Sequence, residues 1–419
     1  VGSGTKTYMV GTLSDETIEQ TVDNEIRAQY AGMEEEAAKN SLLPAIFWRN
    51  SVDTAKIFCV NGDYLADISA VGILDAMMGE TYDYDIYPVI NAQNLVIADL
   101  PAFVSENEEE MQKRYSQSAQ AVYQEIVWPS LTSIASRTGA KMTCMMTPQF
   151  TYTDEEEPDG ENVTYYLKRL KEEHAEAGLS ADSREGILLS EKIKQDQTFW
   201  QTYAPSYRFL SLYADGVKSI GEESALPAEI RTVALGSGAS GQAVGYLNEN
   251  VTLQPSTSSG IRHTFLDDFK VKCMETALGY SNITPDLYSV TYPEGDDDSW
   301  EKMSKKIAAN LGTYWKAYEA FDATTLTESD VRIRRFLALD YKQQRAGNVI
   351  TLSLEHREDA AWFLLRLHGE KVTEVAGGSF EEIEDGVYLI LAEEDEVSVE
   401  VQTGEEWQYQ DGGKCGDGT

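Results

Sequence analysis

The chain has 419 residues, enough for two or three domains, and an apolar fraction of 42%, which is typical of a folded protein. Its 71 acidic residues outnumber 34 basic ones, so the formal net charge is −37. This charge argues against nucleic-acid and anionic-membrane partners, because both are bound through Lys and Arg. Neutral and polycationic ligands are compatible with this charge.

The four cysteines are widely spaced and match neither a disulfide framework nor a zinc-binding pattern (Cys59, Cys144, Cys273 and Cys415). The sequence holds no apolar run of the 18 residues that a transmembrane helix needs. We therefore expect no transmembrane segment in this chain and no metal or other cofactor. The sequence does not predict the oligomeric state.

The first 80 residues predict a small N-terminal α/β unit. Residues 14–40 are polar and helix-prone, with Ser14 as a candidate N-cap. A β-like run, Lys56–Val60, ends at an Asn-Gly pair and is followed by a small-residue helix over residues 67–80. Asp63 comes just past that strand, where α/β enzymes keep catalytic groups. A tight turn explains it equally well, so Asp63 is a ligand-binding candidate with a structural alternative.

Residues 81–345 show a regular alternation of short β-like runs and helices. Helical patterns cover residues 108–139, 162–178 and 190–204, and a long amphipathic helix is expected over residues 298–322. Alternation at this spacing predicts parallel βαβ units, which favour a β/α barrel, with a doubly wound open sheet as the alternative. We count seven β-like runs: Asp85–Gln93, Ala140–Gln149, Ala175–Asp182, Tyr207–Asp215, Arg231–Gly238, Val251–Ser258 and Leu287–Gly295.

The pattern changes to a period of two near residue 346. Residues 346–403 read as antiparallel strands joined by glycine-containing turns, which predicts a small β-sandwich module. The Gly- and Asp-rich residues 404–419 are expected to form a flexible tail.

The carboxyl ends of the predicted parallel strands supply the candidate site, because functional groups gather there in such barrels. The residues at these ends are mainly amides, hydroxyls, aromatics and acids, a set that suits a sugar-binding cleft or, alternatively, simple filling of the barrel top. The ligand-binding candidates are Asn91, Gln93, Gln149 and Tyr292.

Several phrases of the sequence resemble an uncharacterised family of secreted or surface-bound bacterial proteins in the polysaccharide-deacetylase-like (glycoside hydrolase/deacetylase) superfamily. They are "VNGDYLAD", "YPVINAQN", "SENEEEMQKRY", "AEAGLSAD" and "FLLRLHG…GGSFEEIEDGVYLIL", spread between Lys56 and Val401. The resemblance implies a (β/α)7-type barrel over residues 81–345, preceded by part of a flavodoxin-like unit and followed by the β-sandwich module.

The resemblance also implies a divalent metal held by paired acids after the first barrel strand and by a histidine pair after the third. Here the first predicted strand ends "INAQN" and the third ends "GLSADS", so neither place offers these ligands. His263 is the one histidine near a predicted strand end, and a surface position or a helix start explains it too. A metal-dependent deacetylase would therefore need unusual ligands.

A glycoside hydrolase needs only two carboxylates, one on each side of the scissile bond. The catalytic candidates are Glu106, Asp182, Asp215 and Glu294, all at or after predicted strand ends. Chance placement is the alternative in so acidic a chain, and for Glu106 a helix N-terminal position is another.

The sequence thus predicts a bacterial envelope protein that binds a polysaccharide or oligosaccharide and that, if it is an enzyme, is a glycoside hydrolase or carbohydrate esterase. The alternatives are a non-catalytic carbohydrate-binding or scaffold protein with a degenerate barrel, and a deacetylase with unusual metal ligands. We expect an extracellular or cell-surface location, with any leader or anchor outside this chain.

Overall fold

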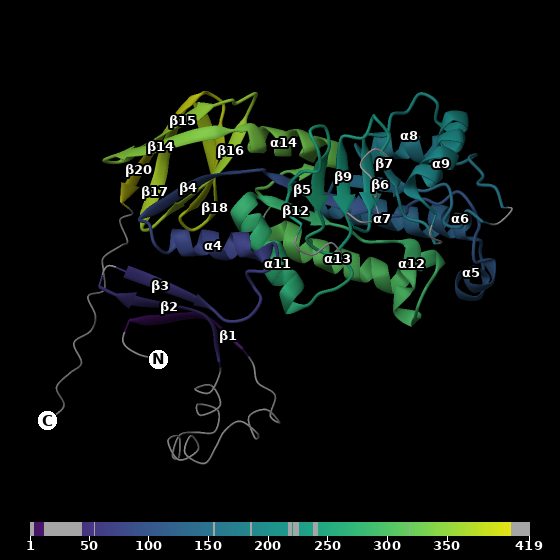
Figure 1. Ribbon diagram of the computed structural model, residues 1–419, viewed down its shortest axis with the longest axis horizontal. Coiled ribbons are helices and arrows are strands. Elements are labelled where there is room, and N and C mark those ends of the chain that lie inside the picture. The colour runs from purple at the N-terminus through teal and green to yellow at the C-terminus, as the bar shows by residue number, and fades with distance from the viewer. Residues whose placement is uncertain are drawn as a thin grey trace, which may run out of the picture.

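Figure 1 shows the computed structural model of the chain, which describes residues 4–11, 44–53, 55–153, 156–184, 187–216, 220, 226–237, 242–317 and 319–403. The helix predicted over residues 14–40 and the tail predicted over 404–419 lie outside these residues. The described chain forms a small antiparallel sheet, a large curled sheet covered by helices, and two further antiparallel sheets that pack together. Among the described helices, none is long and apolar enough to span a bilayer.

The N-terminal sheet contains three antiparallel strands, β1 (Thr5–Val10), β2 (Ala45–Val52) and β3 (Ala55–Val60). The flavodoxin-like unit is not confirmed, because such a unit requires parallel strands whereas β3 runs antiparallel to β2. The predicted helix after β3 is present as α4 (Ser69–Gly79) and packs against α11 (Phe265–Leu278). Gly72 permits this approach, because a Cβ there would lie 2.5 Å from the Cys273 Cα.

The curled sheet is built from short strands that are almost wholly buried, as expected for parallel strands covered on both faces. Its order is β10-β11-β9-β8-β7-β6-β5-β12, with β13 also paired to β5, and all of its pairs are parallel except β10–β11. Its strands are β5 (Ala92–Ile97), β6 (Met142–Met146), β7 (Glu176–Ser180), β8 (Ser211–Ala214), β9 (Thr232–Leu235), β10 (Gly245–Tyr246), β11 (Thr252–Pro255), β12 (Tyr280–Ile283) and β13 (Ala323–Thr324).

The two sides of this sheet approach each other. Ser258, just past β11, forms a parallel bridge with Ile283 at the end of β12, and its carbonyl accepts the Thr284 N–H at 2.8 Å. The sheet is therefore curled strongly enough to bring β11, which lies next to one edge, toward β12, the strand at the opposite edge.

Helices surround the curled sheet and connect its strands (Figure 1). Capping boxes start two of them, with Thr264 and Asp267 before α11 and with Thr325 and Glu328 before α14. The remaining helices are α5 (Glu108–Tyr115), α6 (Ala119–Val122), η1 (Tyr123–Val127), α7 (Trp128–Thr138), α8 (Val163–Glu172), α9 (Leu189–Tyr203), α12 (Tyr288–Thr291), η3 (Asp296–Asp298), α13 (Trp300–Ala317) and α14 (Leu326–Ala338).

Five of the seven predicted strands are confirmed as β6, β7, β8, β9 and β11, and the long predicted helix is confirmed as α13. The first and the last predictions are wrong. Residues predicted as one strand over Asp85–Gln93 divide at Asn91, and the residues before it form β4 (Tyr84–Val89) in another sheet. The run Leu287–Gly295 contains the short helix α12 and no strand, and the sheet strand is instead β12.

The predicted antiparallel strands near the C-terminus are present in two packed sheets, which we call the β-sandwich. One has the order β14-β15-β20-β17 and the other β18-β19-β16-β4. Alternate inward residues fill its core, among them Leu352, Phe363 and Val399. The strands besides β4 are β14 (Asp340–Ala346), β15 (Val349–Glu355), β16 (Ala361–Leu367), β17 (Glu370–Ala376), β18 (Gly378–Glu384), β19 (Val387–Ala392) and β20 (Glu396–Thr403).

Candidate functional site

Four aspartates lie just past the carboxyl ends of strands in the curled sheet: Asp99 after β5, Asp182 after β7, Asp215 after β8 and Asp286 after β12. The Asp215 N–H is 3.4 Å from Asp182 Oδ1. Ser180 connects Asp182 to Asp99, because its Oγ donates to Asp99 Oδ1 at 2.5 Å and accepts the Asp182 N–H at 3.1 Å. We call these four residues the aspartate cluster.

Asp99 is the fully buried member of the cluster. Its backbone is left-handed, with φ of 57°, and the preceding Ala98 forms a parallel bridge with Asp286. Among the described residues no donor reaches Asp99 Oδ2. The Asp99 and Asp286 side chains do face each other. Two carboxylates only accept hydrogen bonds, so this contact forms a hydrogen bond when one of the two holds a proton.

Burial and mutual repulsion raise the carboxyl pKa values of the cluster. Burial raises the pKa of Asp182 to about 7, and the charges of Asp286 and Asp215 add to the effect. The pKa of Asp99 is raised well above its ordinary value by burial and by Asp182 and Asp286, and that of Asp286 is raised chiefly by burial. At neutral pH the cluster therefore retains protons that isolated carboxyl groups would have lost.

A buried cation lies beside the cluster. The Lys192 side chain, only 1% exposed, donates from Nζ to the Ser180 carbonyl at 3.0 Å and to Asp196 Oδ2 at 2.7 Å. The Tyr152 hydroxyl donates to the second Asp196 oxygen, also at 2.7 Å. The positive charge of Lys192 lowers the pKa values of Asp99 and Asp182 and so limits their rise.

Aromatic rings stand next to the cluster. Tyr288, two residues after Asp286, stacks on Tyr292 with ring centroids 5.0 Å apart, and both meet the Phe150 ring edge-on. The Arg184 guanidinium lies 4.4 Å from the Tyr292 ring centroid. Tyr288 and Tyr292 are only partly buried, so they offer ring surface of the kind that covers the apolar face of a sugar.

Glu106 supports these three rings, Phe150, Tyr288 and Tyr292, which we call the aromatic wall. Its Oε1 accepts the N–H groups of Phe150 and Thr151 at 3.0 and 2.9 Å, and the Tyr292 hydroxyl donates to Oε2 at 2.5 Å. The carboxylate is thus engaged in holding the loop after β6 against Tyr292. This geometry suits a positioning role better than the predicted catalytic one.

The four predicted catalytic candidates separate into groups. Asp182 and Asp215 are brought together in the aspartate cluster, and Glu106 lies beside the aromatic wall. Glu294 is exposed, and its backbone N–H donates to Asp298 at 2.8 Å at the start of η3. Within the described residues no contact connects the Glu294 carboxylate to the cluster.

Two predicted ligand-binding amides lie at the opposite end of the curled sheet. Asn91 precedes β5, and its side chain exchanges hydrogen bonds with Asp322. Gln93 is buried at the start of β5 and donates to Glu275 at 3.3 Å. Both were expected at a carboxyl end because the predicted strand, Asp85–Gln93, runs from β4 into the first residues of β5. The structure places them at the amino end of β5 instead.

The other ligand-binding candidates are dispersed. Tyr292 is part of the aromatic wall, and Gln149 lies near it after β6 with its Oε1 buried and unpartnered among the described residues. His263 Nδ1 is 3.2 Å from Asn310 Oδ1, and its Nε2 is 3.4 Å from Asp268, which is not part of the aspartate cluster. Asp63 is exposed in a turn, where its carbonyl accepts the Ala66 N–H.

Sequence reasoning missed Asp99, Asp286 and Lys192. Asp99 follows the apolar run "NLVIA", which is itself a buried strand ending in an acid, and Asp286 follows "YSNITP". Both signals were hidden because the flanking runs were assigned as the strands. Lys192 carries no local signal, since its Asp196 partner at i+4 looks like an ordinary exposed helix pair.

The residues present do not fit the metal centre that the superfamily resemblance implies. The described chain contains no group of three His, Cys, Asp or Glu side chains arranged to hold a metal ion, and three is the usual minimum for a catalytic site. The chemistry of the cluster is therefore derived from the carboxyl groups alone.

Comparisons with known proteins show what the chain is similar to. A family described as "Uncharacterised protein conserved in bacteria (DUF2194)" matches residues 14–185, which confirms the resemblance to an uncharacterised bacterial family. No curated protein matches the chain.

Several solved structures are similar at a low level. A proposed polysaccharide deacetylase from Mycobacterium smegmatis is 9% identical with a TM-score of 0.34, over 57% of this chain and 90% of that one. A proposed glycoside hydrolase/deacetylase from Parabacteroides distasonis is 10% identical with a TM-score of 0.35, over 67% and 82%. A peptidoglycan N-acetylglucosamine deacetylase is 13% identical with a TM-score of 0.26, over 57% and 87%. Likeness at this level does not assign a reaction.

Proposed function

We propose that this chain hydrolyses glycosidic bonds of a polysaccharide at the aspartate cluster. One observation carries the proposal: carboxyl groups from four strand ends converge, and burial raises the pKa of Asp182 to about 7. Two carboxyl groups held in different protonation states by different surroundings are what glycoside hydrolysis requires. Asp182 is half-buried, whereas Asp215 is exposed at the end of β8.

The roles follow from these surroundings. Asp182 is the general acid and transfers its proton to the glycosidic oxygen as the bond from that oxygen to the anomeric carbon breaks. Asp215 accepts a proton from the water that attacks the anomeric carbon, so the products are a new reducing end and a free hydroxyl. Asp286 is a positioning residue whose charge, with that of Asp215, helps to maintain the proton on Asp182. Asp99 is held next to Asp182 through Ser180.

The aromatic wall supplies the sugar subsite in this proposal. The partly exposed rings of Tyr288 and Tyr292 cover the C–H face of a pyranose, while Arg184 at the wall donates to ring hydroxyls. Gly236, past β9, lets the backbone approach Asp215 closely, since a Cβ there would lie 2.7 Å from Asp215 Oδ1 and 2.9 Å from the Tyr213 hydroxyl.

We also propose that the curled sheet is a (β/α)7-type barrel, formed by β5, β6, β7, β8, β9, β11 and β12. The Ser258–Ile283 bridge supports closure between β11 and β12, which the strand ladders alone leave open. Closure brings the ends of β8 and β12 around one mouth, as the aspartate cluster requires.

The test is incubation of the full chain with a panel of acetylated and de-acetylated polysaccharides, with and without EDTA. We expect new reducing ends that persist in EDTA, with no released acetate. Asp182→Asn should lower the rate by about 100-fold or more, because a positioned general acid contributes at least that much. Glu294→Gln, which removes an exposed acid outside the cluster, is the matched control and should leave the rate unchanged.

Three outcomes contradict the proposal. Binding of a glycan without new reducing ends would favour a carbohydrate-binding protein, and acetate release abolished by EDTA would favour a metal-dependent deacetylase. Equal activity of the Asp182→Asn and wild-type chains would place the chemistry elsewhere. The anomeric configuration of the first product, measured by NMR, reports whether Asp215 acts as a base on water.

A further inference from the structure

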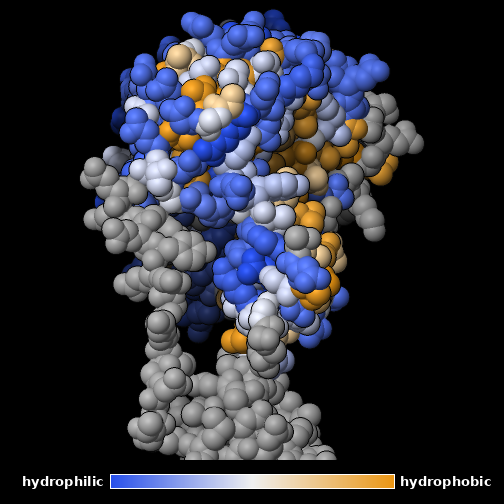
Figure 2. Space-filling model, turned by 90° about the vertical axis from the view of Figure 1, so that its left-hand side faces the viewer, coloured by the Kyte–Doolittle hydropathy of each residue, from blue (hydrophilic) through white to orange (hydrophobic). Residues whose placement is uncertain are grey.

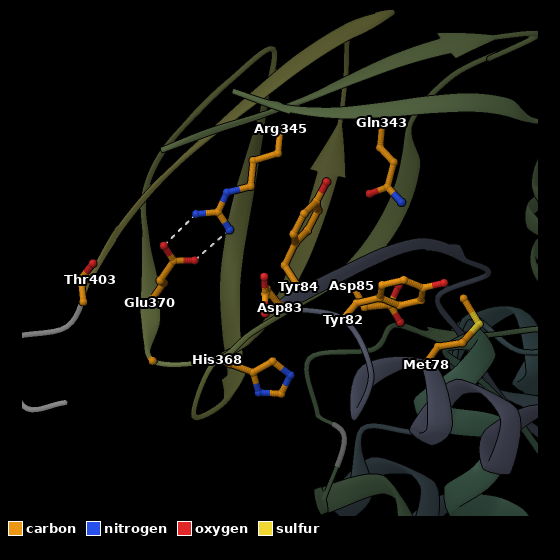
Figure 3. A pocket seen from close by; sticks show the side chains of 11 residues that line it. Met78, Tyr82, Asp83, Tyr84, Asp85, Gln343, Arg345, His368, Glu370 and Thr403 are labelled. Carbon is orange, nitrogen blue, oxygen red and sulfur yellow. Dashed lines mark hydrogen bonds and ion pairs between the residues drawn. The ribbon is translucent and has the colours of Figure 1, made fainter. Parts of the chain in front are cut away.

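A cavity of about 910 Å³ lies outside the curled sheet, where β4 and the residues before it face β14 and the start of β17 (Figure 3). Its size falls within the roughly 300–1,000 Å³ that small-molecule sites occupy. We call it the sandwich pocket and define it by Tyr82, Asp83, Asp85, Gln343, Arg345 and Glu370. Figure 2 shows this end of the molecule as a mainly hydrophilic surface.

The one guanidinium in the lining is already occupied. Arg345 makes a bidentate pair with Glu370 at 2.7 and 2.9 Å, and its Nε donates to the Gly347 carbonyl at 3.0 Å. Figure 3 shows this pair at one side of the pocket. The charge of Arg345 is therefore largely balanced by Glu370.

The acids on the other side are not neutralised in this way. Asp83 is exposed, and Asp85 is only 6% exposed with its Oδ2 unpartnered among the described residues. The Arg366 guanidinium pairs with Asp75 of α4, outside the lining. The described lining holds the acids Asp83, Asp85 and Glu370 against the one guanidinium of Arg345, and this excess of acidic groups favours a cation.

The pocket also presents aromatic and amide surface. The Tyr82 side chain is 57% exposed, and the Gln343 amide points into the pocket from β14. Tyr84 completes the wall beneath Arg345, whose guanidinium lies 5.4 Å from the Tyr84 ring centroid. Tyrosine faces with nearby amides and carboxylates suit a hydroxylated ring rather than a bare ion.

We propose that the sandwich pocket binds an amino sugar with a free ammonium group, as a unit of a polysaccharide. The ammonium group meets Asp83 and the Asp85 carboxyl group, the pyranose face lies on Tyr82, and Gln343 bonds a ring hydroxyl. This proposal takes from the proposed function only that the ligand is a polysaccharide. It concerns a site separate from the aspartate cluster and does not need that cluster to be catalytic.

The test is calorimetric titration of the full chain with a glucosamine tetramer and with its N-acetylated counterpart. We expect the glucosamine tetramer to bind at least about tenfold more tightly, because acetylation removes the charge that the acids recognise. Asp85→Asn and Tyr82→Ala should each weaken binding, the former by about tenfold. Glu381→Gln, which removes an exposed acid from β18 in the same sandwich, is the matched control and should bind as wild type.

The controls separate this proposal from its competitors. Binding that is equally weakened by Glu381→Gln would reflect the −37 charge of the whole chain and would overturn the proposal. So would Ca²⁺ binding without sugar binding, or tighter binding of a lysine tetramer than of the glucosamine tetramer. Asp182→Asn should leave this binding unchanged while abolishing hydrolysis, so failure of one proposal does not imply failure of the other.

Discussion

At the scale of single residues, the convergence of Asp99, Asp182 and Asp286 connects the stability of the fold to pH. Each of the three has a folded-state pKa above its ordinary value, with burial as the largest cause. Between the unfolded pKa near 4 and the folded pKa, the folded state binds more protons than the unfolded state. The stability from these groups is therefore complete below about pH 4 and is lost as pH rises toward 7.

This sign predicts that the chain unfolds more easily at pH 7.5 than at pH 5, and that Asp182→Asn reduces the difference. The amide carries no charge to bury, so the variant should gain about 1–2 kcal/mol of unfolding free energy at pH 7.5 and nothing at pH 4. Urea unfolding of the wild type and the variant at each pH measures these free energies. A variant destabilised equally at both pH values would show that Asp182 is not held protonated by its surroundings.

At the scale of secondary-structure elements, alternation of β-like and helical runs was sufficient to predict β6, β7, β8, β9, β11 and α13. It failed at β4 and β5 within "DIYPVINAQNLVIAD", because the amides of "NAQN" were taken for the end of a strand although Gln93 and Asn94 lie buried in β5. The break within it is a single residue, Asn91, with φ of 56°, a conformation that Asn tolerates better than most residues. Periodicity alone carries no signal for such a break.

That one misplaced break also decided how much of the site was predictable. With the first strand ended at Gln93, Asp99 fell six residues inside the following loop, and the amides at the amino end of β5 were taken for site residues. Asp182 and Asp215 were found because β7 and β8 were assigned correctly. The contact of Ser180 with Asp99 could not be found, since the two residues are 81 positions apart and such contacts leave no local pattern.

Close packing of α4 on α11 predicts a second measurable effect. Gly72→Ala places a Cβ 2.5 Å from the Cys273 Cα and should cost about 1–3 kcal/mol of unfolding free energy, because backbone must move to relieve the overlap. Gly312→Ala in α13 is the matched control: its Cβ would meet nothing within 4 Å, so it should stabilise by about 0.5–1 kcal/mol. Thermal unfolding of the two variants should shift in opposite directions, and a shared direction would contradict the packing.

At the scale of the whole molecule, β4 connects the segment before the curled sheet to the β-sandwich near the C-terminus. It precedes the curled sheet in sequence but pairs with β16 of the β-sandwich from Trp362↔Val89 to Leu367↔Tyr84. Side chains reinforce this link, since Arg366 pairs with Asp75 of α4 and Arg332 of α14 lies 4.5 Å from the Trp362 ring centroid. The sandwich is thus completed by a strand from outside its own stretch of sequence.

This topology predicts that the curled sheet does not fold independently of the sandwich. A chain ended at Leu339 lacks β14 to β20, so it leaves β4 as an unpaired strand and uncovers Ile86 and Val89, which are 1% and 2% exposed in the full chain. We expect this truncated chain to aggregate or to lose the cooperative thermal transition. In the full chain, calorimetry should show both units unfolding in one transition. A soluble truncated chain that keeps hydrolysing polysaccharide would instead mean that β4 is dispensable and that the two units are independent domains.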